Sequence, residues 1–304
     1  MKITIIGSGA MGCLFGGLLA EAGADVHLLD IWEEHVQALN TYGVSISSSG
    51  EERHIPVQAS TDPKKIQQTD LALIFVKHAQ TAKAAQTATS LLGKHGALLT
   101  LQNGMGNAEI LTEAAGKDRV ICGTTAQGAM ILGPGRIQHS GTGKTVIGMW
   151  EGKEHCLLHE VAAILSNASL DTSTTEDIRP VLWSKLFANV GINAITALTN
   201  IRNGELLDLP ETRELVNSAV QEALEVASAY DISVSPDALE QVFNIARATA
   251  PNRSSMGQDI DAGRVTEIEA INGYILDLAE KSGISVPINK ALTALVKTLQ
   301  SHYE

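Results

Sequence analysis

Residues 2–12 read KITIIGSGAMG, an apolar run followed by three glycines at fixed spacing. The run Lys2–Ile6 is rich in β-branched residues and predicts a strand buried in a sheet. Gly7, Gly9 and Gly12 fit the pattern GxGxxG, which binds a dinucleotide when it joins a strand to a helix. The glycines permit a tight turn, close approach of a pyrophosphate, and close packing of helix on strand. We therefore expect a dinucleotide site formed by Gly7, Ser8, Gly9, Ala10, Met11 and Gly12. A purely structural turn is the alternative.

The first half of the chain repeats this alternation of strand and helix. Further strands are expected at Val26–Leu29, Leu71–Val76, Ala97–Leu101 and Val120–Gly123. Helices are expected at Gly12–Ala22, Glu33–Tyr42 and His155–Ser166. Such alternation predicts an α/β, doubly wound, Rossmann-type domain. Turn signals between Gly133 and Gly148 separate short alternating runs, which we interpret as late strands that close the same sheet.

From about Glu176 onward the sequence predicts helices only. Apolar residues recur at helical spacing in Val181–Leu198, Glu211–Tyr230, Pro236–Ala248 and Val265–Lys281. We therefore expect two domains: residues 1–172 bind the dinucleotide, and residues 173–304 form an all-helical domain for substrate and catalysis.

Composition excludes several classes of function. The 304 residues are 44% hydrophobic and carry a net charge of −12, which argues against binding to nucleic acid or to anionic membranes. The glycines interrupt any signal peptide, and no run approaches the roughly 20 apolar residues of a membrane span. Three scattered cysteines without CxxC, and no HExxH, predict neither disulfides nor a metal site and fit the reducing cytoplasm. A homodimer is compatible with this composition, which does not specify the oligomeric state.

Asp30 ends the second predicted strand, 23 residues after Gly7. A carboxylate at this position accepts hydrogen bonds from the ribose hydroxyls of NAD, and it would repel the 2′-phosphate of NADP. No arginine follows nearby, so NAD(H) is favoured over NADP(H). The alternative is a solvated aspartate or a cap for the next helix.

Residues 182–198 read LWSKLFANVGINAITAL, and their apolar side chains lie nearly all round a helix, which predicts burial. Lys185, Asn189 and Asn193 form its one coherent polar line, at i, i+4 and i+8. A lysine on such a helix needs a carboxylate or a wet cleft, and burial would make it a better acid. A lysine that reaches solvent at the helix edge is an equally good interpretation.

Five further residues carry candidate polar groups. Ser254 and Ser255 precede a predicted helix that contains Glu267, which lies at the border of its apolar face and could pair with Lys185 or simply face solvent. Asn103 and Lys77 each follow a predicted strand, at the carboxyl edge where doubly wound sheets bind ligands. A simple turn is the alternative there.

The combination of these motifs resembles the ketopantoate reductase (2-dehydropantoate 2-reductase) family over nearly the whole chain. The matching pieces are Gly7–Gly12, Val76-Lys77, Gln102–Gly106, Leu182–Leu186, Asn189 with Asn193, Asn203–Leu206, Ser254–Met256 with Gln258-Asp259, and Thr266–Ile268 with Ile271–Gly273. Each piece alone is weak, but together, in this order and with these internal spacings, they are highly specific.

The resemblance implies a Rossmann domain, a helical domain like the C-terminal part of 6-phosphogluconate dehydrogenase, and an active site in the cleft between them. It implies that Lys185 donates a proton to the substrate and that Glu267 orients this lysine and the nicotinamide ribose. The implied ligands of a small 2-keto acid are Asn103, Lys185, Asn189, Asn193, Asn203 and Ser255. The implied cofactor site also includes Asn103, Lys77 and Ala129.

One position departs from the family pattern. Many members carry an arginine just after the second strand, where this chain has Leu29-Asp30-Ile31, so the usual preference for NADP is in doubt. The expected reaction is reduction of ketopantoate to pantoate, a step in pantothenate and coenzyme A biosynthesis. One alternative is an NAD-dependent D-2-hydroxyacid dehydrogenase of the mandelate type. Another is a dinucleotide sensor without turnover, which the presence of Lys185 and Glu267 disfavours.

Overall fold

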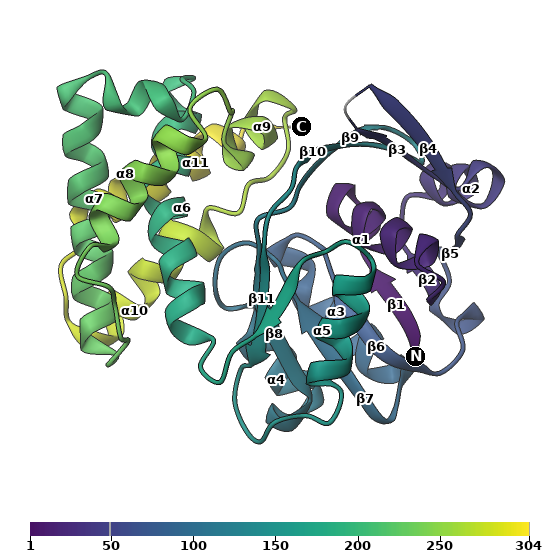
Figure 1. Ribbon diagram of the computed structural model, residues 1–304. Helices are drawn as coiled ribbons and strands as arrows, with labels where there is room; N and C mark the ends of the chain where they lie inside the picture. Colours follow the sequence, from purple (N-terminus) through teal and green to yellow (C-terminus); the bar gives the residue numbers. More distant parts are fainter. Residues whose placement is uncertain (49, 304) are drawn as a thin grey trace. The chain divides into compact units, whose positions relative to one another are not determined.

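The computed structural model describes residues 1–48 and 50–303, which form two compact units. Unit 1 comprises residues 1–102 and 107–178, and unit 2 comprises residues 103–106 and 179–304. Figure 1 shows that unit 1 contains the strands and that unit 2 consists of helices. The short segment 103–106 therefore belongs with the helices although it lies in the sequence of the sheet unit.

Unit 1 is built on an eight-stranded sheet with the order β12-β11-β8-β7-β6-β1-β2-β5. Its strands are β1 (Lys2–Ile6), β2 (Asp25–Leu29), β5 (Gln58–Ser60), β6 (Thr69–Ile74), β7 (Leu92–Thr100), β8 (Val120–Thr125), β11 (Thr145–Met149) and β12 (Thr172–Thr174). Its helices are α1 (Ala10–Glu21), α2 (Glu33–Tyr42), α3 (Thr81–Leu91), α4 (Asn107–Ala115) and α5 (Leu158–Asn167), with short 3-10 turns η1 (Pro63–Lys65), η2 (His78–Gln80) and η3 (Lys117–Arg119).

The sheet is doubly wound, as predicted. Strand β1 pairs in parallel with both β2 and β6, so the strand order reverses at β1, and ligands of such sheets bind at the carboxyl ends of the strands beside this reversal. All neighbouring pairs are parallel except β8 with β11. The glycine turn that follows β1 therefore lies at the position where this fold binds ligands.

A second, four-stranded sheet was not predicted. It has the order β4-β3-β10-β9, formed by β3 (Val44–Ser48), β4 (Glu51–Ile55), β9 (Gly128–Gly133) and β10 (Arg136–Gly141). The expectation that the run Gly133–Gly148 contains late strands of the main sheet is correct for β11 and wrong for β10. Strand β10 instead pairs with β3, which places the fully buried Ile137 beside the fully buried Ile46.

Helix α1 contacts both sheets. Its glycines permit this, because a Cβ on Gly16 would lie 2.5 Å from Leu28 of the main sheet and a Cβ on Gly17 would lie 3.2 Å from Ile46 of the second sheet. Figure 1 shows the second sheet as a long, curved layer near α1. These two glycines thus narrow α1 at the positions where the two sheets pack against it.

Unit 2 consists of α6 (Arg179–Thr199), η4 (Gly204–Leu207), α7 (Pro210–Ala229), α8 (Ala238–Ala248), α9 (Ser255–Asp261), a π-helical segment η5 (Glu269–Gly273), α10 (Tyr274–Ser282) and α11 (Pro287–Gln300). Helix α6 is central, since it contacts α7, α8, α9, η5 and α11. Within the described residues, α6 is the one helix that is long and apolar enough to cross a membrane, which corrects the expectation that no run approaches that length. Because 72% of its apolar window is buried, α6 has the character of a core helix.

The predicted helix Val265–Lys281 is interrupted. Its first residues are not helical, because the backbone N–H and the hydroxyl of Thr266 both donate to Oε1 of Gln300, at 3.1 and 2.9 Å. Helical backbone begins only with the π-helical segment η5 and continues as α10. The predicted apolar face is nevertheless correct, since Ile268, Ile271 and Ile275 are buried.

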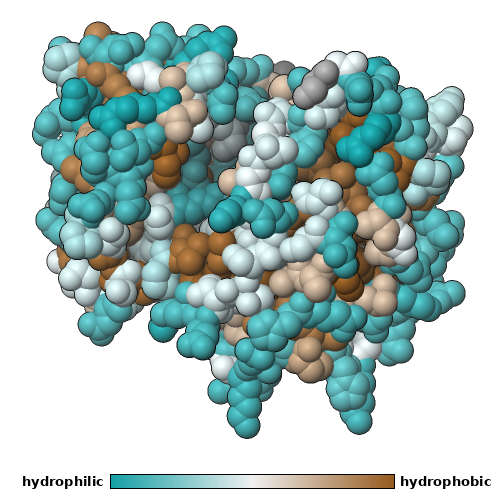
Figure 2. Space-filling view, in the orientation of Figure 1, coloured by the Kyte–Doolittle hydropathy of each residue, from teal (hydrophilic) through white to brown (hydrophobic). Residues whose placement is uncertain are grey.

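Hydrophilic residues cover most of the face shown in Figure 2, and hydrophobic ones gather in separate patches. This surface agrees with the net charge of −12. The largest fully buried side chains are all leucine, isoleucine or phenylalanine.

Candidate active site

The glycine turn in unit 1 has the local geometry that its sequence predicts. Gly7 has a φ of +90°, and a Cβ there would lie 2.8 Å from the backbone nitrogen of Val76. A Cβ on Gly12 would lie 2.0 Å from the carbonyl oxygen of Gly7, so this glycine permits the close packing of α1 on β1. A Cβ on Gly9 would meet no atom within 4 Å, which leaves open space in front of the turn.

Asp30 lies against this turn. Its Oδ2 accepts hydrogen bonds from the backbone N–H of Ser8 at 2.6 Å and from the Ser8 hydroxyl at 3.0 Å. Its Oδ1 accepts from the backbone N–H of Trp32 at 3.1 Å. A carboxylate offers about four acceptor positions. Asp30 therefore braces the turn and the start of α2 and still has room for another donor.

The two remaining predicted cofactor residues of unit 1 lie on different elements. Lys77 is exposed and follows β6, and its carbonyl accepts from Gln80 at the end of η2. The preceding carbonyl, that of Val76, accepts from Nε2 of Gln102 at 2.6 Å. Ala129 lies on β9 of the second sheet, so it is on a different strand layer from the residues that follow β1, β2 and β6. Gln102 thus anchors this loop, a role that its place in the Gln102–Gly106 motif did not predict.

Helix α6 is buried from Leu182 to Ala197 except at Ser184, Lys185 and Asn189. The last two of these residues belong to the polar line. Burial lowers the pKa of Lys185 to about 8. The side-chain nitrogens of Asn189 and Asn193 are buried and have no hydrogen-bond partner. A buried amide without a partner costs roughly 1–3 kcal/mol, so these two donors are typical of groups kept for a ligand.

Asn203 shows the same feature after the end of α6. Its backbone N–H donates to the carbonyl of Asn252 at 3.0 Å, and its Nδ2 donates to the hydroxyl of Thr249 at 2.9 Å. Its Oδ1 is buried and unpaired. Because the rest of Asn203 is held in place, this oxygen is fixed as an acceptor.

Ser255 is exposed and begins the short helix α9. The expectation that Ser255 precedes a helix containing Glu267 is wrong, because Glu267 itself lies outside a helix, just before η5. The preceding Ser254 caps α9 by accepting from the N–H of Gly257 at 3.1 Å. Ser254 also accepts from the hydroxyl of Thr196 at 2.7 Å. That bond fixes the start of α9 to α6, one turn beyond Asn193.

Glu267 is partly buried and immediately precedes the buried Ile268 and η5. The segment 103–106 joins unit 2 at this place, since the N–H of Met105 donates to the carbonyl of Ala270 at 2.8 Å. A Cβ on Gly104, where φ is +78°, would lie 2.5 Å from that carbonyl oxygen. The glycine therefore allows the loop that starts with Asn103 to contact the segment that follows Glu267.

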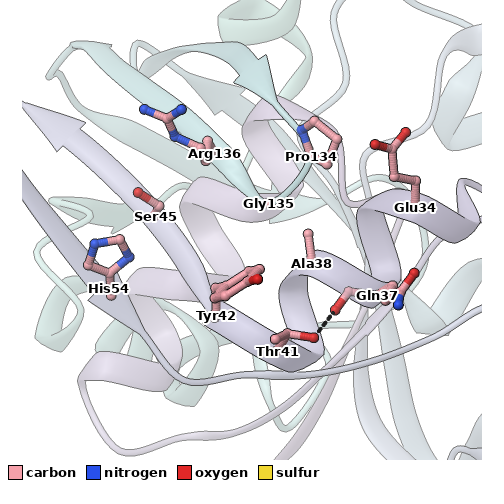
Figure 3. A pocket seen from close by; sticks show the side chains of 11 residues that line it. Glu34, Gln37, Ala38, Thr41, Tyr42, Ser45, His54, Pro134, Gly135 and Arg136 are labelled. Atoms are coloured by element: carbon pink, nitrogen blue, oxygen red, sulfur yellow. Dashed lines mark hydrogen bonds between the residues drawn. The ribbon is translucent and has the colours of Figure 1, made fainter.

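A pocket of about 770 Å³ opens elsewhere in unit 1, at α2, β3, β4 and the turn between β9 and β10. Figure 3 shows Tyr42, Glu34, His54 and Arg136 around it, with the hydroxyl of Thr41 bonded to the carbonyl of Gln37 at 2.8 Å. None of the residues predicted to bind dinucleotide or keto acid lines it. The pocket therefore gives no indication of the reaction.

Comparison with known proteins matches both parts of the chain to one family. Residues 3–152 match the family described as ketopantoate reductase PanE/ApbA, and residues 177–300 match its C-terminal family. A 2-dehydropantoate 2-reductase of Halobacterium salinarum is 37% identical over 304 residues, which cover 99% of each chain.

Solved structures give the same result. The crystal structure of a PanE/ApbA family ketopantoate reductase from Ralstonia eutropha is 32% identical and superimposes with a TM-score of 0.91 over 99% of each chain. The ternary structure of D-mandelate dehydrogenase with NADH and anilino(oxo)acetate is 28% identical, with a TM-score of 0.93 over 99% of each chain.

Proposed function

The chain belongs to the ketopantoate reductase family, and from this premise we propose that it is a 2-dehydropantoate 2-reductase. It would reduce the keto group of 2-dehydropantoate to give pantoate, in the supply of pantothenate and coenzyme A. The observation that carries the proposal is the polar line of α6, where a lysine with a lowered pKa stands beside two buried amides that have no partner.

Unit 1 fits a nicotinamide dinucleotide. The space in front of Gly9 is open, no side chain caps the start of α1, and its first turn carries no acidic residue. The N-terminus of a helix in this state favours an anion, so the turn from Gly7 to Gly12 would hold the pyrophosphate. When bound, the dinucleotide would supply the hydride. Lys77, Asn103, Ala129 and Glu267 complete the proposed cofactor site.

Asp30 supports a preference for NADH over NADPH. Its carboxylate already lies at the turn, retains acceptor capacity for a ribose hydroxyl, and would repel a 2′-phosphate. NADPH is the alternative.

Lys185 would donate the proton that the substrate oxygen gains during reduction. A pKa of about 8 leaves this ammonium largely protonated near neutral pH and makes it a stronger acid than an ordinary lysine. Its charge would also stabilise the developing alkoxide. Glu267 would orient this lysine.

The asparagines would hold the substrate. The unpaired Nδ2 groups of Asn189 and Asn193 can donate to its carboxylate or hydroxyl oxygens, and the unpaired Oδ1 of Asn203 can accept from its hydroxyl. Asn103 and Ser255 would complete this set. Binding would then remove the cost of leaving these buried groups without partners, which is a direct source of specificity for a substrate with several oxygens.

The test is a set of turnover assays with 2-dehydropantoate, 2-ketoisovalerate and phenylpyruvate, each with NADH and with NADPH. The proposal predicts the highest kcat/KM for 2-dehydropantoate, because only that substrate brings the extra hydroxyl. A higher value for phenylpyruvate would favour the second candidate, a D-2-hydroxyacid dehydrogenase of the mandelate type. The likeness to D-mandelate dehydrogenase, whose structure contains NADH, is the observation in its favour.

The proposed cytoplasmic location rests on the three free cysteines.

A further inference from the structure

His35 lies on α2 and is fully buried, with hydrogen-bond partners on opposite sides of its ring, and its Nε2 also lies 3.4 Å from the sulfur of Cys13. Its Nε2 is 2.8 Å from the carbonyl oxygen of Ser8, in the middle of the glycine turn. Its Nδ1 accepts from the backbone N–H of Gly135 at 3.0 Å, in the turn between β9 and β10. The ring stacks on Trp32 with 4.9 Å between centroids, which fixes its plane.

These two bonds determine the tautomer of His35. A backbone N–H can only donate, so Nδ1 must carry a lone pair and the proton must be on Nε2. Nε2 therefore donates to the carbonyl of Ser8. Burial lowers the pKa of His35 below its ordinary value, although Asp30 acts in the opposite direction, so the neutral ring that both bonds require is the favoured form.

The bond to Ser8 has a consequence for the next residue. The peptide between Ser8 and Gly9 is trans, as are all peptide bonds in the described residues, so the N–H of Gly9 points away from the carbonyl that His35 holds. The thiol of Cys13 also donates to that carbonyl, at 3.0 Å, and burial raises the pKa of this thiol, which keeps it protonated. On the other side of Ser8, Asp30 holds its N–H and its hydroxyl.

We propose that His35 is a positioning residue for the dinucleotide, because it fixes the peptide plane that presents the N–H of Gly9 to the pyrophosphate. The inference rests on the proposed function of the glycine turn and assigns to His35 a role that no sequence motif predicts. It also explains a purpose for the second sheet. The carbonyl of Gly135 accepts from Ser45 of β3 at 2.8 Å, so His35 links that sheet to the turn. A turn fixed before the ligand arrives loses less entropy on binding.

The experiment measures the Kd of NADH by fluorescence titration without keto acid, for four folded variants. His35→Phe keeps a flat ring but removes both bonds. His35→Gln restores a donor at the position of Nε2, and His35→Asn restores only an acceptor at the position of Nδ1. His155→Phe is the matched control, since the Nδ1 of His155 likewise accepts from a backbone N–H, that of Leu157, at 3.1 Å.

We expect His35→Phe to raise the Kd about tenfold, as for the loss of one buried hydrogen bond, with kcat at saturating NADH changed less than about threefold. His35→Gln should recover most of the affinity for NADH, whereas His35→Asn should bind as weakly as His35→Phe. The control His155→Phe should keep the wild-type Kd. Long-range proton–nitrogen spectra should show His35 protonated on Nε2.

Wild-type affinity in folded His35→Phe would overturn the inference, as would rescue by His35→Asn in place of His35→Gln, or an Nδ1-protonated ring. If His35→Phe fails to fold, the comparison of His35→Gln with His35→Asn decides. Failure of dinucleotide binding itself is distinguishable, because the wild-type protein would then bind neither NADH nor NADPH. Failure of the assigned substrate would appear only in the turnover assays and would leave this comparison of Kd values intact.

Discussion

The glycine turn of unit 1 and the polar line of unit 2 treat buried polar groups in opposite ways. Around the turn, the N–H, the hydroxyl and the carbonyl of Ser8 all have partners, supplied by Asp30, His35 and Cys13. Along α6 and just after it, Asn189, Asn193 and Asn203 each keep one buried amide atom without a partner. Under the proposed function, the two sites would obtain their binding energy in different ways. The turn would gain affinity from rigidity, whereas the asparagines would gain it from hydrogen bonds that only a ligand can complete.

The largest effect should come from Lys185. Lys185→Ala removes the proposed proton donor and the charge that would lie beside the developing alkoxide, so kcat for reduction of 2-dehydropantoate should fall by roughly 10²–10⁴. The Kd of NADH, measured separately, should change little because the turn is intact. Lys281→Ala, an exposed lysine in the last turn of α10, is the control and should retain activity. Full activity in Lys185→Ala would remove this lysine from the mechanism.

Asn193→Leu tests the contrast between the two regions most clearly. The substitution keeps the number and branching of the side-chain heavy atoms and removes a buried donor that has no partner, so the free energy of unfolding should stay equal or rise by about 1 kcal/mol. The kcat/KM for 2-dehydropantoate should fall about tenfold, since one hydrogen bond to the substrate is lost. Urea unfolding and steady-state kinetics measure the two quantities.

Thr196→Val on the same helix is the matched contrast. Thr196 is buried and donates to Ser254, so its loss should destabilise the protein by about 1–3 kcal/mol. If Asn193→Leu were as destabilising as Thr196→Val, Asn193 would be a structural residue. The contrast between the paired groups of the turn and the unpaired asparagine atoms would then not hold.

A smaller effect is expected at Asp30. Asp30→Asn keeps an acceptor for Ser8 but removes the negative charge that would repel a 2′-phosphate, so the ratio of kcat/KM for NADPH to that for NADH should rise about fivefold. Kinetics with both dinucleotides measure it. An unchanged ratio would show that Asp30 acts only as a brace for the turn.

The parts of the fold that could be predicted from sequence are those determined by local pattern. The bounds of β1 and α2 agree with the expected Lys2–Ile6 and Glu33–Tyr42, because strand and helix periods are visible within each segment. The second sheet was missed since β3 and β10 are about ninety residues apart, and alternation along a strand does not identify its partner. The break before η5 was missed for a similar reason, because Thr266 bonds to the distant Gln300.

The candidate site divides in the same way. Helical spacing is sufficient to align Lys185, Asn189 and Asn193, and the structure bears out the burial of this helix. His35 could not be distinguished from an ordinary buried residue, because its sequence signal is only a position on the apolar side of α2, beside Val36 and Leu39. Its partners, Ser8 and Gly135, come from remote segments that only the fold brings together.

The pH dependence of kcat/KM for 2-dehydropantoate, which follows the ionisations of the enzyme before the keto acid binds, tests the role of Lys185 most directly. The donor must be protonated, and burial lowers its pKa to about 8, so activity should be constant below that pH and fall tenfold for each pH unit above it. The residual activity of Lys185→Ala should lack this decline. A wild-type rate that stays constant up to the ordinary pKa of a lysine, or a decline that persists in Lys185→Ala, would contradict the account.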